Sequence, residues 1–181
     1  MKITTTGIEG VAIVDLEERA DERGFFARTF CRDEFEAAGL VPAVEQCNLS
    51  YNHLAGTLRG MHTQVDPAPE AKLVRCTAGA IQDVIVDLRE GSPTYLKHVA
   101  VELTAQNRRA LYVPPYFAHG YLTLTDGAEV VYQVSQKYTP GTERGLRYDD
   151  PDLALPWARD VAVISDKDKS WTLLADGAVL S

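Results

Sequence analysis

The side chain with the clearest chemical potential in this sequence is His62, within the run LRGMHTQ of residues 58–64. A neutral imidazole is the natural base near neutral pH, because its ordinary pKa lies close to that pH. A lone histidine on a strand is usually structural, but Arg59 and Lys72 stand close to this one in the sequence. These residue types indicate proton transfer on a bound anion, which favours an enzyme.

Two further residues could complete such chemistry. Tyr132 lies in the apolar run 130–134, where an aromatic ring usually packs in the core, although a phenol opposite a base can also donate or accept a proton. Asp168 lies in the charged run 166–169. It is either a solvated surface charge or the carboxylate that orients His62 and stabilises its protonated form. Spacing alone does not choose between these interpretations.

Several cationic side chains are candidate contacts for an anion, because guanidinium forks match phosphate oxygens. They are Arg23, Arg59, Lys72, Arg75 and Lys167. Each is a weak signal alone, since most surface cations are simply solvated. The sequence has no glycine-rich phosphate loop and no GxGxxG before a helix, so a Rossmann cofactor site is not expected.

A metal site is the main chemical alternative. Two histidines one residue apart on a strand are a common ligand pair, but here the second position is Gln64. His119 could join His62, whereas His53 and His98 are expected in a loop and on a surface strand. Two neutral ligands with no assigned carboxylate are a poor zinc or iron site. We therefore expect no metal and no other cofactor.

Composition excludes several classes of function. The 181 residues suit one domain, 1–181, and carry a net charge of -8, which disfavours binding to nucleic acid or to acidic membranes. No apolar stretch is long enough to span a bilayer, and the start of the chain lacks the apolar run of a signal peptide. Three cysteines without CxxC spacing are expected as buried thiols. The sequence predicts a cytoplasmic protein.

The elements that must position these residues read mostly as strands. Strands are expected at 11–16, 25–30, 72–77, 81–88, 99–103, 110–113, 120–124 and 128–134. One short helix is expected at 33–38, ended by Gly39. Many short strands with turns between them are typical of an antiparallel sandwich or barrel, whereas a parallel α/β fold needs repeated helices.

Local patterns add three expectations about these strands. Asp126-Gly127 is the strongest hairpin signal, and 78–80 is a second hairpin-like break. In 81–88 the alternation predicts that Asp83 lies on a more polar face. Simple alternation also places Arg59 and His62 on opposite faces of a strand, so a twist or a bulge would be needed to bring them together.

Read together, the motifs resemble the dTDP-4-dehydrorhamnose 3,5-epimerase family. The resemblance covers nearly the whole chain in order, and as a set the motifs are highly specific. It rests on 21–26 (DERGFF), 46–50 (QCNLS), 58–64, 72–75 (KLVR), 83–89 (DVIVDLR), 92–94 (SPT), 117–120 (FAHG), Tyr132, Tyr138, Glu143, 149–151 (DDP) and 165–168 (SDKD).

The resemblance implies a metal-independent cupin jelly roll, all-β with a few short helices. It also implies a homodimer whose sites take residues from both subunits. The implied substrate is a nucleoside-diphospho-4-keto-6-deoxy sugar, most simply dTDP-4-dehydro-6-deoxy-D-glucose, which is converted to dTDP-4-dehydro-L-rhamnose. The carbonyl of such a sugar acidifies the neighbouring C3 and C5 protons.

By the same resemblance, His62 is the base, Asp168 is its partner, Lys72 stabilises the enolate oxygen and Tyr132 returns the proton from the opposite face. The implied substrate-binding residues are Arg23, Phe26, Arg28, Gln46, Asn48, Arg59, His119, Tyr138, Glu143 and Lys167. Phe26 matches a position that the partner subunit contributes near the nucleotide.

Two positions depart from the family pattern. Arg28 stands where the family commonly carries a glutamate, and Tyr116 replaces a usual glycine before His119. Neither touches the four catalytic candidates, so chemistry is better defined than substrate. The alternatives left open are an epimerase acting at C3 alone and an enzyme for a CDP- or GDP-linked sugar. A metal-dependent cupin and a silent sugar-nucleotide-binding cupin are the other two.

Overall fold

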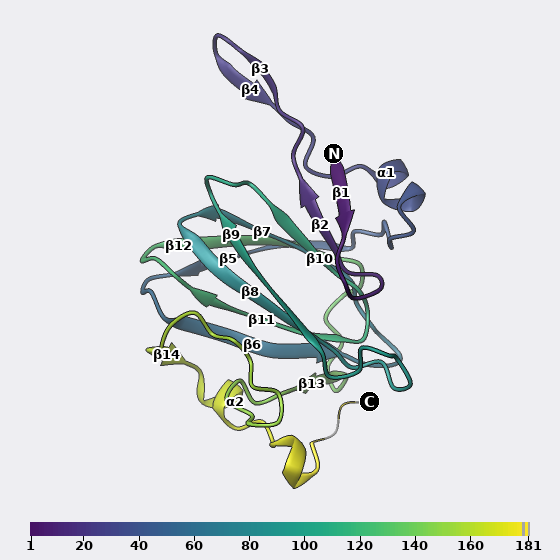
Figure 1. Ribbon diagram of the computed structural model, residues 1–181, viewed down its shortest axis with the longest axis vertical. Coiled ribbons are helices and arrows are strands. Elements are labelled where there is room, and N and C mark those ends of the chain that lie inside the picture. Colours follow the sequence, from purple (N-terminus) through teal and green to yellow (C-terminus); the bar gives the residue numbers. More distant parts are fainter. Residues whose placement is uncertain (179, 181) are drawn as a thin grey trace.

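The computed structural model describes residues 1–178 and 180 and consists mainly of antiparallel strands (Figure 1). The first sheet has the order β1-β2-β10-β7-β12-β5. Its strands are β1 (Lys2–Thr5), β2 (Ala12–Asp15), β5 (Gln46–Asn52), β7 (Lys72–Ala78), β10 (Ala110–Val113) and β12 (Ala128–Val134). The all-β prediction is confirmed.

The second sheet packs against the first and has the order β13-β6-β11-β8-β9, with β14 parallel to β6 at its side. Its strands are β6 (Thr57–Gln64), β8 (Ala80–Asp87), β9 (His98–Thr104), β11 (Phe117–Thr123), β13 (Glu143–Gly145) and β14 (Val163–Ile164). The main core lies between the sheets, where Val74 and Val130 of one meet Ile85 and Phe117 of the other. Side chains alternate across a strand, so each strand contributes every second residue to this core.

Both hairpin predictions are wrong, although the turns are real. The strands around Asp126-Gly127 are β11 and β12, which lie in different sheets, and the same holds for β7 and β8 around 78–80. Each turn therefore carries the chain from one sheet to the other. Partner choice is decided by which neighbours complete each sheet, and turn chemistry does not encode that choice.

The more polar face predicted for β8 is found, but it is buried. Asp83 and Asp87 are fully buried, on the side of the strand whose Ile85 belongs to the main core. The other side is buried as well, because Val84 and Val86 pack against the chain around Leu153. Both faces are covered, so the strand shows no exposed polar side.

The remaining expected elements are shorter or shifted. The strand expected at 25–30 is only β4 (Gly24–Phe26), which pairs with β3 (Arg19–Asp21). The expected helix is α1 (Arg32–Ala37), and Gly39 follows it with φ of 72°. Of the cysteines, Cys76 is buried but Cys47 is exposed on β5, the last strand of its sheet.

Two segments extend beyond the sandwich. Figure 1 shows the β3–β4 hairpin projecting away from the sheets at the purple end of the chain. At the yellow end, the C-terminal segment with α2 (Asp166–Lys169) and η1 (Leu174–Asp176) lies along the side of β6. No helix of the described chain is long and apolar enough to cross a membrane.

A β-bulge in β6 resolves the question of strand faces. Arg59 pairs with Tyr121 and His62 pairs with His119, so β6 has one more residue than β11 between the two pairs. The extra residue turns Arg59 and His62 to the same side. At the bulge, Gly60 has φ of 124° and lies against the backbone of Gly120.

The bulge predicts a sharp steric limit at Gly60. A Cβ on this residue would lie 2.5 Å from Gly120 Cα and 2.8 Å from the His119 carbonyl oxygen, and both are backbone atoms that cannot rotate away. The energetic costs of overpacking and of a positive φ in alanine add together, so Gly60→Ala should lower the free energy of unfolding by about 2–4 kcal/mol. Urea denaturation measures this change.

The matched control is Gly7→Ala, because a Cβ on Gly7 would meet no atom within 4 Å and the residue has no positive φ. It should change the unfolding free energy by less than about 0.5 kcal/mol. Equal stability of the two variants would contradict the steric account of the bulge.

Candidate active site

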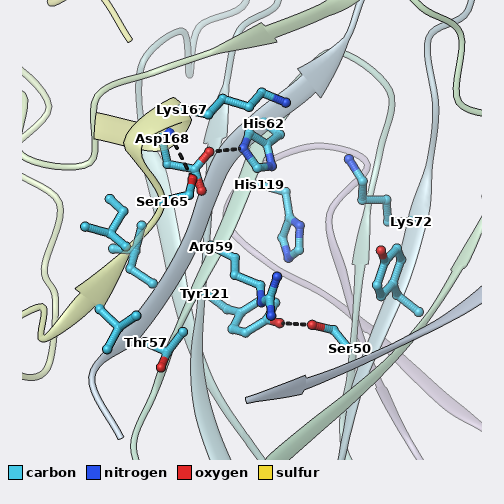
Figure 2. A pocket seen from close by; sticks show the side chains of 14 residues that line it. Ser50, Thr57, Arg59, His62, Lys72, His119, Tyr121, Ser165, Lys167 and Asp168 are labelled. Carbon is cyan, nitrogen blue, oxygen red and sulfur yellow. Dashed lines mark hydrogen bonds and ion pairs between the residues drawn. The ribbon is translucent and has the colours of Figure 1, made fainter. Parts of the chain in front are cut away.

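A pocket of about 520 Å³ opens between the sheets and collects most of the reactive side chains (Figure 2). One wall comes from β6, β11, β14 and α2, and the other from β5, β7 and β12. It is lined by Ser50, Thr57, Leu58, Arg59, His62, Lys72, His119, Tyr121, Tyr132, Val163, Ile164, Ser165, Lys167 and Asp168. All four catalytic candidates therefore face one space.

His62 is paired with Asp168 at the centre of one wall. Its Nε2 lies 2.6 Å from Asp168 Oδ1, and the Asp168 side chain is only 6% exposed. The second carboxylate oxygen accepts the Gly60 N–H at 3.2 Å, while Ser165 caps α2 by accepting the Asp168 N–H. The carboxylate therefore holds the imidazole ring and leaves Nδ1 as the nitrogen available to act as a base.

The charge state of Asp168 suits this role. Burial raises the pKa of its carboxyl, but the hydrogen bonds from His62 and from the Gly60 N–H outweigh it and hold the pKa below its usual range. Asp168 is therefore ionised at neutral pH and can stabilise an imidazolium on His62.

Lys72 and Tyr132 stand on the opposite wall. The Lys72 side chain is 10% exposed, and Figure 2 shows its ammonium turned toward the space in front of His62. Burial, followed by the negative charges that Tyr121 and Glu70 can carry, raises the pKa of the Tyr132 phenol. Tyr132 therefore keeps its proton at neutral pH and can donate it.

Polar partners that the sequence did not reveal support the pocket from behind. Asp83 is fully buried, and its Oδ1 lies 2.6 Å from His119 Nε2 in a close contact that does not have hydrogen-bond geometry. Arg59 donates to Asn52 Oδ1 at 2.8 Å. The only signal in the sequence for the Asp83–His119 contact is the alternation of residues 81–88, which does not show that Asp83 is buried.

A second, smaller pocket of about 170 Å³ shares His62, Lys72 and Tyr132 with the first. It adds four of the residues expected to bind substrate, namely Gln46, Asn48, Tyr138 and Glu143. The Glu143 carboxylate lies 2.5 Å from the Lys167 ammonium, which also approaches the ring of Trp171. The two pockets thus form neighbouring parts of one site around His62, Lys72 and Tyr132.

Comparison with known proteins decides the family. The family model described as dTDP-4-dehydrorhamnose 3,5-epimerase matches residues 5–176. A 3,5-epimerase of Shigella flexneri is 41% identical over 169 residues, which cover 93% of each chain. The chain belongs to the dTDP-4-dehydrorhamnose 3,5-epimerase family.

Two other relatives extend the comparison. A dTDP-4-dehydrorhamnose 3-epimerase of Streptomyces niveus is 40% identical over 177 residues, covering 97% of this chain and 85% of that protein. The crystal structure of the 3,5-epimerase of Bacillus anthracis, with TDP and PPi bound, has a TM-score of 0.91 and 37% identity. The matched part covers 95% of this chain and 98% of the Bacillus anthracis chain. The family assignment makes the protein an isomerase with the cupin jelly-roll fold, as the resemblance implied.

Three expected binding residues of this family member do not reach the pocket of their own chain. Arg23 pairs with Asp21 at the tip of the β3–β4 hairpin, Phe26 is 67% exposed on β4, and Arg28 pairs with Glu34 at 3.2 Å. The β3–β4 hairpin, which carries Arg23 and Phe26, projects from the sheets (Figure 1), and none of the three residues lines either pocket that contains His62.

Two further positions also lie outside the site. Arg75 was a candidate anion contact, but it projects from the other face of β7 and donates to the Arg108 carbonyl at 2.8 Å. This is the alternation of a strand whose Lys72 faces inward. Tyr116 does occupy the turn before β11, with φ of 65°, but its hydroxyl donates to Asp66 and its ring lines a separate pocket. Within the described chain, no group of three or more His, Cys, Asp or Glu side chains is arranged to hold a metal ion.

The His62–Asp168 pair predicts a pH-dependent contribution to stability. Because the pKa of Asp168 is lower in the folded protein than its ordinary 3.8, the folded state binds fewer protons there. The contribution is therefore complete above the unfolded pKa and is lost as the pH falls through the folded pKa. Asp168→Asn should lower the free energy of unfolding by about 1.5–3 kcal/mol at pH 7. Urea denaturation measures this change.

The difference in the free energy of unfolding between the wild type and Asp168→Asn should shrink steadily as the pH is lowered below about 4, where an ordinary aspartate takes up its proton. Asp166→Asn is the control, since Asp166 lies exposed on the same helix. A difference for Asp168→Asn that stays constant down to about pH 3 would refute the linkage.

Proposed function

We propose that the protein epimerises dTDP-4-dehydro-6-deoxy-D-glucose at C3 and C5 to give dTDP-4-dehydro-L-rhamnose. The observation that carries this proposal is the opposition, across one pocket, of a histidine held by a buried carboxylate and a tyrosine that keeps its proton. Family membership supplies the substrate class, and the TDP bound by the Bacillus anthracis relative supports a thymidine nucleotide.

The proposed reaction needs only proton transfers. The C4 carbonyl acidifies the adjacent C–H bond, and His62 Nδ1 takes that proton as the electrons pass to the C4 oxygen. Asp168 stabilises the resulting imidazolium, while Lys72 stabilises the enolate oxygen. Tyr132 then donates its proton to the opposite face of the same carbon, which inverts it. His62 and Tyr132 regain their starting states by exchange with solvent.

The rest of the site would bind the nucleotide and the sugar. Arg59 and Lys167 supply positive charge around the first pocket, where a diphosphate would need it, and His119 lines the same pocket. Gln46, Asn48, Tyr138 and Glu143 surround the second pocket. The exposed ring of Tyr138 offers a face for a nucleobase.

We also propose that the enzyme is a homodimer with shared sites. The β3–β4 hairpin carries Arg23 and Phe26, Arg28 follows it, and none of the three lines the pocket of its own chain. The rings of Phe25 and Phe26 are both exposed. A hairpin of this kind is stable only against a larger surface, and a second copy of the chain provides one. The hairpin would place Phe26 beside the nucleotide in the partner's site. A single cytoplasmic domain without metal or cofactor completes the proposal.

Isotope exchange tests the chemistry directly. In heavy water, the wild type should introduce deuterium at C3 and C5 of dTDP-4-dehydro-6-deoxy-D-glucose, which NMR detects at each carbon. Removing a positioned base should slow exchange by about 10²–10⁴-fold in His62→Ala. Label at C3 alone would identify the C3-only alternative, and exchange only with a CDP- or GDP-linked sugar would change the nucleotide.

Tyr132→Phe separates the acid from the base. Without the phenol, His62 can still remove and return a proton on the same face, so deuterium should enter with retained configuration. Inversion should fall by about 10²-fold or more relative to exchange. Equal loss of exchange and inversion would assign Tyr132 to substrate binding or to folding. No exchange with any of these sugars, from protein that still binds dTDP, would favour the silent binding cupin.

The shared site has its own test. Phe26→Ser should raise KM for the nucleotide sugar by about 10-fold to 100-fold with little change in kcat, because burying a phenylalanine is worth about 1.5–3 kcal/mol. Sedimentation should show a dimer for both proteins. A monomeric wild type with full activity would overturn the shared-site proposal.

A further inference from the structure

The site contains one buried carboxylate that the proposed reaction does not use. Glu70 lies just before β7, and its Oε1 is 2.7 Å from the Lys72 ammonium. The two side chains are 12% and 10% exposed, so the pair is largely shielded from water. A residue two positions before Lys72 on an extended chain points to the same side, and Glu70 accordingly lines the smaller pocket with Lys72 and Tyr132.

The backbone around Glu70 is held firmly. The next residue, Ala71, donates its N–H to Ser135 Oγ at 2.8 Å and accepts the Ser135 N–H at 2.9 Å. Pro69 fixes φ on the other side of Glu70. The carboxylate therefore has a defined position against β12 and is not a side chain on a loose loop.

The other carboxylates of the site already have partners. Asp168 holds His62, Asp83 contacts His119, and Glu143 pairs with Lys167. Within the described residues, Glu70 is the carboxylate within ion-pair distance of Lys72. In each of these four pairs, the basic side chain thus lies within 2.7 Å of its own acidic partner.

We propose that Glu70 is a positioning residue, which fixes the Lys72 ammonium at the point where the enolate oxygen develops. This role rests on the proposed function. Lysine has four rotatable side-chain bonds and three N–H donors. Pairing with one carboxylate restricts the side chain while donors remain for the substrate. A preorganised ammonium needs no rearrangement when the negative charge appears.

The effect should fall on the chemical step. Glu70→Ala should lower kcat by about 10-fold to 100-fold, the size expected when a charged group loses its alignment. The Kd for dTDP, measured by calorimetry, should change by less than about threefold, since Lys72 acts on the sugar and not on the nucleotide. Glu70→Gln keeps a carbonyl oxygen at the same place and should recover part of the lost kcat.

A readout on the free protein separates this proposal from the reaction itself. The Lys72 ¹⁵N-ammonium resonance, assigned by its absence in Lys72→Ala, should be visible in the wild type because the ion pair and burial slow proton exchange. It should broaden or shift in Glu70→Ala. The exposed Glu102 on β9 provides the matched control, and Glu102→Ala should leave the resonance and kcat unchanged.

The outcomes are distinct. An unchanged Lys72 resonance in Glu70→Ala, or a kcat equal to that of the wild type, would overturn the positioning role. A loss of dTDP affinity as large as the loss of kcat would also overturn it, by making Glu70 a binding residue. If the resonance responds but the wild type exchanges no deuterium into the keto sugar, the pairing stands and the proposed reaction fails.

Discussion

The contact between Gly60 and Gly120 is the constraint on which the site depends. The extra residue of β6 at this point turns Arg59 and His62 to the same side of the sheet. It also directs the Gly60 N–H to Asp168, so one local irregularity aligns the base and its carboxylate. A regular strand would separate Arg59 from His62 and bury one of them in the wrong layer. Only residues without a side chain allow the backbones to approach so closely.

The division of the site between two sheets explains its proposed chemistry. His62 and Asp168, the proposed base and its carboxylate, lie on the side of β6 and α2. Lys72 and Tyr132 come from β7 and β12 of the other sheet. A sugar held between the sheets would meet a base on one face and an acid on the other. Inversion requires this arrangement, and the sandwich provides it through its rigid core without a moving part.

Electrostatics reconcile an acidic protein with an anionic ligand. The net charge is -8, yet the pocket gathers Arg59, Lys72, His119 and Lys167. Buried carboxylates behind or beside these groups hold them in place, as Asp83 does for His119. The local field at the site is thus set by paired charges in a partly dry space, where they act more strongly than charges on the surface.

The sequence by itself determined the all-β class and the family, because residue types and motif order carry this information, and it supplied the four catalytic candidates. The pairing of the strands could not be predicted from the sequence. Two turns that resemble hairpin turns in fact join strands of different sheets. The nearness of Asp168 to His62, 106 residues apart, and of Asp83 to His119 was also decided only by tertiary structure. Such contacts depend on which strands are neighbours and on a bulge, and neither follows from local propensity or alternation. Glu70 was missed in the sequence, although its spacing of two residues from Lys72 is a signal that could have placed the two side chains on the same side of an extended segment.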